Sequence, residues 1–395
     1  MTVAHPINRA WISTGGTGAQ NYDEFANEAE ITAIIADNPD SALAVEMPHL
    51  ALATLGHTFT QSLPAAAQRL TSAKGDGKYR SARDIVAVYR IGADFYGVFC
   101  LIDTDQISAK LDEPGLVIRN EDVFVEKVRE RVALAEAVDH MLSPVLLLQS
   151  GEGARLHTLL VEMSARLGAP DLIDVDHTGR DHAIWILGPG PGRDAALALA
   201  GGGELIVADG NHRSLAAQTG GWPAFLAVVT TPESVGIQPY NRLLSGVDVD
   251  LEKLRAAGAE VDPLPGRPEV PKTGGVIHMY VKGAGYAVTL PAPADAPLVD
   301  RLDHALVERQ LFGAALGLDA GDKRITYVGG DYPASWLCDQ VDLGEATCAV
   351  LIAPVTVRDF IDVNLSRQKL PRKSTWFTPK ARAGLVLSEV PRVAK

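Results

Sequence analysis

The segment of residues 205–217, Leu-Ile-Val-Ala-Asp-Gly-Asn-His-Arg-Ser-Leu-Ala-Ala, limits the fold more than any other part of the sequence. Its apolar start predicts a buried strand at residues 204–208, Asp209 and Gly210 predict a tight turn, and a helix is expected from Asn211 to residue 219. A strand that passes directly into a helix is typical of mixed α/β folds. The same alternation continues along the chain, with helices predicted at residues 28–37, 65–74, 121–139, 154–167 and 303–316 and strands at 42–46, 84–90, 95–103, 144–149 and 224–229.

Length and composition then set the scale of the fold. The chain has 395 residues, 47% hydrophobic and 22% charged, which excludes a disordered, collagen-like or coiled-coil protein. At roughly 150 residues per domain, two or three domains are expected. We predict an α/β (α+β) architecture with an N-terminal α/β part at residues 1–104, a central core at 105–235 and a C-terminal α+β domain at 236–395.

The balance of charge narrows the choice of partners. The formal net charge is −13, and so acidic a surface argues against nucleic acid, whose backbone recruits clustered cations. We expect no membrane span and no secretory signal, because no apolar run approaches the roughly 18 residues that a span needs. The three cysteines are far apart and are predicted to be buried and free. A cytoplasmic protein is expected.

The turn at Asp209 is the first candidate site. A helix N-terminus offers free backbone N–H groups and the positive end of a dipole, which suits phosphate. His212 and Arg213 fall in the first turn, where cations are unfavourable unless something anionic lies opposite. The alternative is that Asp209 merely caps the helix and Arg213 is solvated, and the spacing leaves both open.

The second candidate is Glu121 at the start of the helix predicted for residues 121–139, with Asn120 placed to cap it. A carboxylate there either matches the helix dipole on the surface or acts as a general base toward a substrate hydroxyl. Lys127 and Arg131 follow on the same helix and either flank a phosphate or face solvent.

Two further stretches, residues 174–179 and 370–380, carry polar side chains that could form a site. Residues 174–179 begin like a calcium loop, but the twelfth position is Trp185 rather than a carboxylate, so we predict a turn between strands and satisfied polar roles for His177 and His182. Residues 370–380 carry Lys373, Ser374 and Thr375, which either bind an anion or form a surface loop anchored by a tryptophan.

Four stretches together resemble the family known as domain of unknown function 1015. They are Asn21-Tyr-Asp-Glu-Phe25, followed by Asn38-Pro39 and Val45-Glu-Met-Pro48; Asn120-Glu121 with Lys127 and Arg131; Asp209-Gly-Asn-His-Arg213; and Pro371-Arg-Lys-Ser-Thr-Trp-Phe-Thr-Pro-Lys380. The family has histidine where this chain has Asn120 and Asn211. Asparagine hydrogen-bonds but cannot shuttle a proton, so any chemistry that needs those histidines is changed or lost here.

The central part also resembles the ParB/sulfiredoxin-like superfamily, and within it free serine kinase. This resemblance implies a nucleotide-binding core and a kinase that phosphorylates a small metabolite, serine or a related amino acid, with ATP or ADP and Mg²⁺. It implies catalytic roles for Glu121, Asp209 and His212, with Asp209 also at the metal. The residues implied in cofactor binding are Gly210, Asn211, His212, Arg213, Lys127, Arg131, Lys373, Ser374 and Thr375.

Three hypotheses follow for the function. The first is the metabolite kinase, and a homodimer is compatible with it. The second is a nucleotide-binding switch or partner-binding protein of the ParB type, which binds nucleotide without making a phosphorylated metabolite. The third is an enzyme that activates a carboxylate with ATP and releases AMP or pyrophosphate rather than ADP.

Overall fold

The computed structural model describes residues 2–25, 27–108, 113, 115–319 and 321–392. The chain divides into two compact units, the first made of Met1–Val235 and Pro379–Lys395 and the second of Gly236–Thr378. Helices and strands are mixed in both units, which confirms the predicted α/β class. The division into three parts at residues 104 and 235 stays a prediction. Strands β4 (Phe95–Asp103) and β12 (Ala224–Thr230), on either side of residue 104, pair with one another in a single sheet.

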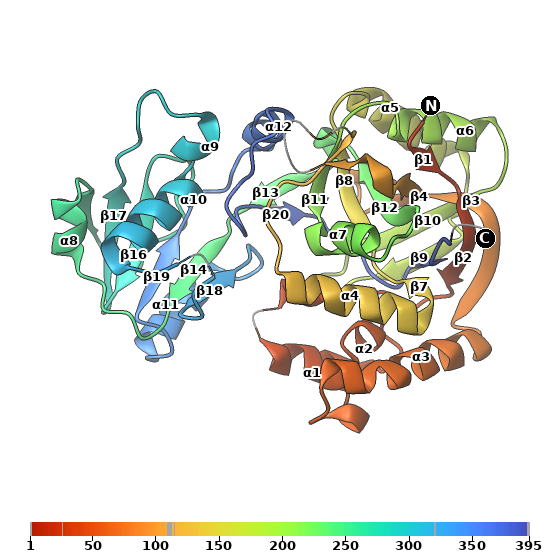
Figure 1. Ribbon diagram of the computed structural model, residues 1–395, viewed down its shortest axis with the longest axis horizontal. Helices are drawn as coiled ribbons and strands as arrows, with labels where there is room; N and C mark the ends of the chain where they lie inside the picture. Colours follow the sequence, from red (N-terminus) through yellow and green to blue (C-terminus); the bar gives the residue numbers. More distant parts are fainter. Residues whose placement is uncertain (1, 26, 109–112, 114, 320, 393–395) are drawn as a thin grey trace. The chain divides into compact units, whose positions relative to one another are not determined.

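The first unit is built on one large mixed sheet (Figure 1). Its central strands β8 and β12 are buried at every position, which is typical of strands covered on both faces. Within the described residues the strands follow the order β5 (Ile107–Ser108), β6 (Val117–Ile118), β11 (Leu205–Asp209), β8 (Val145–Gln149), β12 (Ala224–Thr230), β4 (Phe95–Asp103), β3 (Tyr79–Ile91), β2 (Ile7–Ser13), β21 (Val386–Glu389) and β7 (His140–Met141). Off this path, β1 (Ala4–His5) pairs with β4, and β10 (Asp181–Leu187) pairs with β3 and with β9 (Leu172–Val175).

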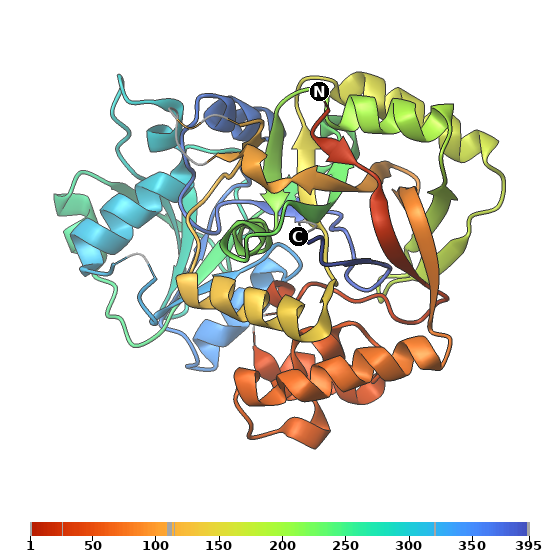
Figure 2. The same ribbon diagram turned by 45° about the vertical axis from the view of Figure 1, so that its right-hand side comes forward.

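Helices cover both faces of this sheet. Helices α5 (Gly153–Arg166) and α6 (Pro191–Ala200) lie on one face, and α7 (Asn211–Thr219) with α4 (Val125–Val138) lies on the other (Figure 1). Helix α3 (Phe59–Gly75) runs beside α4 in both views (Figure 2). Helix α2 (Leu43–Glu46) contacts α3, and α1 (Glu28–Asp37) contacts α2. The helix predicted at residues 28–37 and the hairpin of β3 and β4 are confirmed.

The strand predicted at residues 42–46 is wrong, because the chain forms the short helix α2 there. All four residues of α2 are buried. A short apolar run buried on every side has no periodicity that separates a helix from a strand. The following Pro48 opens a 3₁₀ turn rather than continuing a strand.

The second unit has its own sheet, with two hydrophobic clusters. Alternate residues of β19 divide between the clusters, because successive side chains of a strand point to opposite faces: Cys348 and Val350 join one, Ala349 and Leu351 the other. The strand order is β15 (Glu260–Leu264), β17 (Ala284–Thr289), β16 (Ile277–Val281), β19 (Cys348–Leu351), β14 (Asn241–Leu244) and β18 (Ile325–Val328). A separate ribbon pairs β13 (Gly236–Gln238) with β20 (Trp376–Thr378).

Helices of the second unit supply the other half of each cluster. Residues of α8 (Leu251–Ala256), α10 (Asp303–Leu306) and the π-helix η6 (Val307–Leu316) belong to the first cluster, and residues of α11 (Ala334–Asp342) belong to the second. The unit also contains α9 (Leu298–Arg301) and α12 (Val357–Leu365). The cysteines Cys100, Cys338 and Cys348 are buried and free, as predicted. In the part of the chain that the structure describes, no helix is both long and apolar enough to cross a membrane.

Candidate functional site

The predicted strand, turn and helix at residues 205–219 are present as β11, a turn at Gly210 and α7. Gly210 has φ of +94°, a left-handed conformation that favours glycine. A Cβ atom on Gly210 would also lie 2.9 Å from Nε of Arg213, so the turn leaves no room for a side chain. Gly210, and not Asp209, is the N-cap residue of α7, so the interpretation of Asp209 as a simple cap is wrong.

The side chain of Arg213 folds back over this turn and is almost completely buried. Its Nη2 is ion-paired with Asp209, and its Nη1 donates to Oδ1 of Asn21 at 3.1 Å and to the carbonyl of Pro144 at 2.7 Å. Nζ of Lys380 lies 3.5 Å from the other carboxylate oxygen of Asp209. Burial alone would lower the pKa of Arg213, but Asp209 and other nearby acidic groups raise it above its usual range. Arg213 is therefore not the solvated surface group of the alternative interpretation.

Two contacts, one buried and one partly buried, join α7 to the segment that carries Glu121. Nδ2 of Asn211 donates to Oδ1 of Asn120 at 2.5 Å, and Oδ1 of Asn211 has no hydrogen-bond partner among the described residues. Nε2 of His212 accepts the backbone N–H of Phe124 at 3.1 Å, and the two rings are stacked with their planes 7° apart. The asparagines at the two positions where the family has histidine are thus bonded to one another.

Helix α4 begins later than predicted, at Val125, with Phe124 as its N-cap residue. Asn120 therefore does not cap the helix, because its side chain is bonded to α7. Glu121 is partly exposed and precedes the first turn instead of lying in it. The angular relation that a continuous helix would impose on Glu121, Lys127 and Arg131 does not hold.

Lys127 and Arg131 lie on the side of α4 that faces Tyr22. The guanidinium of Arg131 lies over the Tyr22 ring at 4.3 Å and donates to the carbonyl of Glu46 at 3.3 Å, and only 7% of the residue is exposed. Lys127 is exposed, with Nζ 5.6 Å from the centre of the same ring. Arg131, Glu46 and Arg213 line a common cavity of about 50 Å³, so the structure does bring the two arginines together.

Lys373, Ser374 and Thr375 belong to the second unit, whereas all the other predicted site residues belong to the first. The Ser374 hydroxyl donates to the carbonyl of Pro371 at 2.7 Å, and Nζ of Lys373 lies 5.5 Å from the Tyr240 ring. Trp376 is buried, and its Nε1 donates to Asp331 at 3.3 Å. The tryptophan anchor is confirmed, and anion binding by these three residues stays a prediction.

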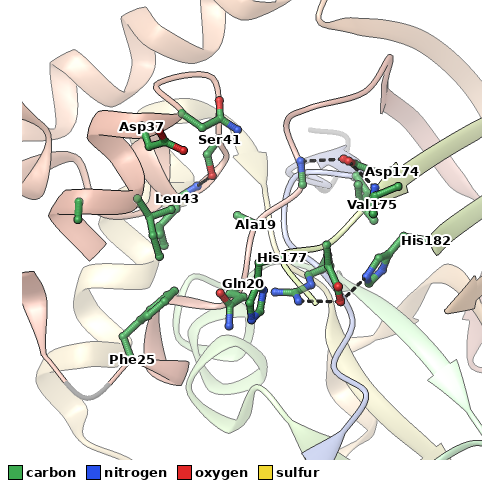
Figure 3. Close-up of a pocket in the computed structure, with 17 residues that line it drawn as sticks. Ala19, Gln20, Phe25, Asp37, Ser41, Leu43, Asp174, Val175, His177 and His182 are labelled. Atoms are coloured by element: carbon green, nitrogen blue, oxygen red, sulfur yellow. Dashed lines mark hydrogen bonds and ion pairs between the residues drawn. The ribbon is translucent and has the colours of Figure 1, made fainter. Parts of the chain in front are cut away.

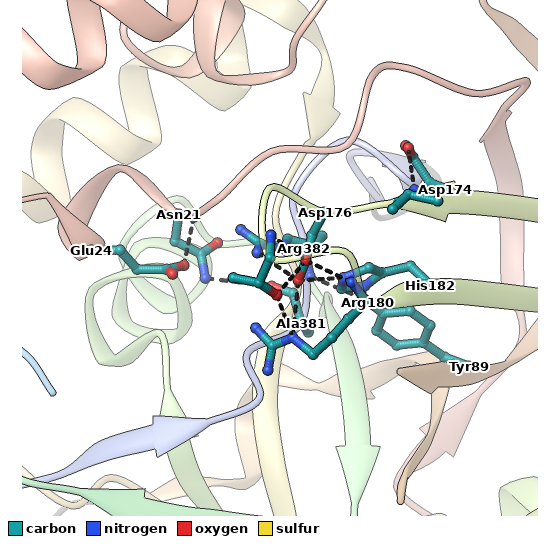
Figure 4. Close-up of polar contacts among 11 residues, drawn as sticks. Asn21, Glu24, Tyr89, Asp174, Asp176, Arg180, His182, Ala381 and Arg382 are labelled. Carbon is teal, nitrogen blue, oxygen red and sulfur yellow. Dashed lines mark hydrogen bonds and ion pairs between the residues drawn. The ribbon is translucent and has the colours of Figure 1, made fainter. Parts of the chain in front are cut away.

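A second polar cluster surrounds Asp176 in the turn between β9 and β10 (Figure 4). Oδ2 of Asp176 accepts from Arg180 at 3.1 Å, from His182 at 3.2 Å and from Arg382 at 3.1 Å. Burial alone would raise the pKa of Asp176, but hydrogen bonds from the Thr178 hydroxyl, the Arg180 backbone N–H, His182 and Arg382 hold it well below its usual range. The predicted turn and the satisfied role of His182 are confirmed, while His177 is exposed.

Sequence reasoning missed the parts that Asn21 and Arg382 play. Asn21 bonds to Arg213, and its Nδ2 lies 3.4 Å from the carbonyl of Ala381, so it links the turn at Asp209 to the segment that carries Arg382. The only signal for Asn21 was its place in a family motif, and Arg382 lay just past the last motif. Among the described residues, no group of three or more His, Cys, Asp and Glu side chains could hold a metal, and the metal role of Asp209 stays a prediction.

A family model described as protein of unknown function (DUF1015) matches residues 17–305. No curated protein matches the sequence. Solved structures with a similar fold include a conserved hypothetical protein from Pyrococcus furiosus, at 13% identity and a TM-score of 0.39, covering 74% of this chain and 94% of that one. Others are free serine kinase in complex with AMP (12% identity, TM-score 0.39, 74% and 92% covered) and SbnI with a C-terminal truncation from Staphylococcus aureus (15%, 0.41, 74% and 87%). Likenesses of this size carry no information on activity.

Proposed function

The chain is a member of the DUF1015 family, and from that premise we propose that it is a nucleotide-dependent phosphotransferase acting on the hydroxyl of a small metabolite. Serine or a related amino acid is the leading acceptor. One observation carries the proposal: the first unit brings Asn21, residues 120–124, Asp209–Arg213 and Lys380 together around the N-terminus of α7. The cytoplasmic location and the dependence on Mg²⁺ belong to the same proposal.

The phosphate of ATP or ADP would be held at the turn of β11 and α7. The turn offers the free backbone N–H groups of Gly210 and Asn211 and the His212 ring, with Arg213 and Lys380 on either side of Asp209. Phosphoryl transfer depends mostly on such positioning and on neutralisation of charge. Mg²⁺ would neutralise phosphate charge, held mainly by the phosphates themselves with Asp209 as the protein ligand.

Glu121 would take the proton from the acceptor hydroxyl. Its neighbour Asn120 is fixed by Asn211, which keeps the Glu121 segment beside the turn at Asp209. A general base has to lie within hydrogen-bond reach of its substrate, and partial exposure leaves Glu121 accessible to one. Lys127 and Arg131 are the additional cations proposed for this side, and anion binding by Lys373, Ser374 and Thr375 of the second unit is a separate proposal.

The test is incubation of the purified chain with Mg²⁺, each of ATP, ADP and CTP, and a pool of free amino acids, followed by mass spectrometry. We expect a new phosphorylated species that disappears in Glu121→Gln and persists in the control Glu126→Gln, an exposed glutamate in the first turn of α4. Full activity in Glu121→Gln would exclude the proposed base.

Two other outcomes separate the alternatives. A rise in melting temperature with nucleotide, without product, would favour a nucleotide-binding switch. The ion pair of Asp209 with Arg213 makes this the second candidate, because the guanidinium already has an anionic partner without a phosphate. Release of AMP or pyrophosphate would instead indicate carboxylate activation.

A further inference from the structure

The first unit contains a cavity of about 520 Å³ that shares no lining residue with the turn at Asp209 (Figure 3). Its walls come from residues 18–25, from α1 and the residues after it, from the turn between β9 and β10, and from residues 382–385. The volume is in the range of pockets that enclose small molecules.

One part of the lining is apolar. Phe25, Ile34, Leu43 and Leu385 line the cavity, and Leu43 and Leu385 are completely buried. Small-molecule pockets commonly combine such a wall with a few convergent polar groups. The cavity therefore favours a ligand with a hydrocarbon or aromatic body.

Asp176, His182 and Arg382 form a polar floor of the cavity, and they are hydrogen-bonded to one another. Asp176 accepts hydrogen bonds from both Arg382 and His182, as described above, and Arg180 adds a second cation to the same carboxylate. Together these side chains carry a net charge of +1, but Arg180 does not line the cavity, and the lining pair of Arg382 and Asp176 is balanced in charge. The cation of Arg382 in particular is committed to Asp176.

The remaining charge on the lining is negative. Asp37, at the end of α1, has no hydrogen bond or ion pair with any described residue, and neither do Gln20 and His177. Asp174 accepts only backbone N–H groups, from Gly18 at 3.2 Å and Val175 at 2.9 Å, and no cation of the described chain pairs with it. Asp37 and Asp174 lie on opposite sides of the cavity in Figure 3.

The edge of the cavity at Gly18 is closely fitted. A Cβ atom on Gly18 would lie 2.8 Å from Oδ2 of Asp174 and 2.8 Å from a methyl carbon of Leu385. The backbone can approach this carboxylate only because residue 18 is a glycine. The carboxylate is thus held in place before any ligand arrives, which lowers the cost of binding.

We infer that this cavity is a binding site for an organic cation, a small molecule with a primary ammonium group on an apolar body. The ammonium would pair with Asp174, Asp37 would add negative charge from the opposite side of the cavity, the oxygen of the Gln20 amide would accept a hydrogen bond, and the body would lie on the apolar wall. A net negative chain also attracts cations and repels anions from such a cavity. The site stands apart from the proposed phosphotransferase chemistry and does not depend on it.

The test uses three probes of one shape and different charge: 2-phenylethylamine, 2-phenylethanol and 3-phenylpropanoate. Binding to the full chain is titrated by saturation-transfer NMR up to about 10 mM, the range suited to a fragment of this size. We expect one saturable site for the amine, with the alcohol and the carboxylate weaker by about tenfold or more, the usual worth of a charge-assisted contact.

Matched variants locate that site. Asp174→Asn should weaken the amine by about tenfold and Asp37→Asn should weaken it less, and Glu28→Gln, on the same helix α1 but outside the cavity, should leave it unchanged. Ala33→Trp, which fills the cavity from an exposed position on α1, should abolish binding even if Asp174→Asn fails to fold. Equal binding of the three probes, no saturable binding of the amine, or unchanged binding in Asp37→Asn and Ala33→Trp would each overturn the inference.

Discussion

Gly210 is the residue on which the turn between β11 and α7 depends, because it combines a left-handed backbone with a side-chain position that Arg213 fills. We expect Gly210→Ala to lower the free energy of unfolding by about 1–2 kcal/mol, since alanine is strained at positive φ and its Cβ displaces Arg213 from Asp209. Urea unfolding measures the change. Gly188→Ala is the matched control, since nothing lies within 4 Å of its Cβ position and its φ is not positive.

A Gly210→Ala variant as stable as Gly188→Ala would mean that the turn rearranges at no cost. The ion pair of Arg213 and Asp209 would then not be fixed by the backbone. Its part in the proposed phosphate site would need another explanation.

His182 carries a pH dependence that follows from its burial. Burial lowers its pKa to about 4 in the folded chain, although its bond to Asp176 acts in the opposite direction. The Tyr89 hydroxyl donates to Nδ1 at 2.6 Å and Nε2–H donates to Asp176, so the ring is neutral and has no free nitrogen. Between pH 4 and the unfolded value of about 6.5, the unfolded chain binds a proton at this residue and the folded chain does not.

Stability contributed by His182 is therefore fully present at pH 7 and falls as the pH is lowered from about 6.5 toward 4, by about 3 kcal/mol at most. Unfolding free energies of the wild type and of His182→Gln, measured from pH 7 to pH 4.5, check this. The variant should show a shallower slope, and His57→Gln, at an exposed histidine, should keep the wild-type slope. Equal slopes in all three would contradict a buried neutral His182.

At the scale of elements, the start of α4 is fixed by a side chain from another helix. Nε2 of His212 accepts the backbone N–H of Phe124, one of the N-terminal groups that has no partner inside its own helix. We expect His212→Ala to lower the local opening free energy there by about 1 kcal/mol. Hydrogen exchange of residues 124–128 should then be about fivefold faster. Exchange in α5 should not change, and unchanged exchange at 124–128 would show that something else fixes the helix.

The same contact explains why the sequence predicted α4 only in part. The apolar period of residues 125–138 identified the helix, but its start was placed at Glu121 on the strength of Asn120 as a cap. Asn120 is instead bonded to Asn211, a contact with a residue far away in the sequence that no local pattern contains. Burial on all sides likewise hid the helical nature of α2.

The candidate site also has one part that local sequence signals predict and another that depends on contacts between distant residues. The turn at Asp209 could be predicted, because a strand, a glycine and a helix start are local signals. The partners that neutralise Asp209 and Arg213 could not, because Asn21 and Lys380 reach the turn from opposite ends of the chain. The cavity bordered by Asp37 and Asp174 is missing from the sequence reasoning for the same reason.

At the scale of the whole molecule, the second unit is one continuous segment of the chain, whereas the first unit is made of two segments. Both hydrophobic clusters of the second unit are built from residues within 236–378. Two clusters among the described residues of the first unit include Ala383 and Leu387, which follow the second unit in the sequence. We expect a fragment of residues 236–378 to unfold cooperatively on heating, with near-ultraviolet circular dichroism of packed aromatic rings, and a fragment of residues 1–235 to lack both signatures.

Differential scanning calorimetry of the two fragments and of the full chain checks this expectation. The 236–378 transition should coincide with part of the unfolding profile of the full chain. A cooperative transition in the 1–235 fragment would contradict the dependence on Ala383 and Leu387.

Strand β21 pairs with both β2 and β7 in the first sheet. A ribosome makes β2 before every residue of the second unit and β21 only after all of them. The second unit can therefore fold before β21 has been made. During that time the edges of β2 and β7 that pair with β21 are unpaired, although most of the first unit was made earlier. Unpaired edges are sites of aggregation, so this chain should need chaperones until β21 has been made.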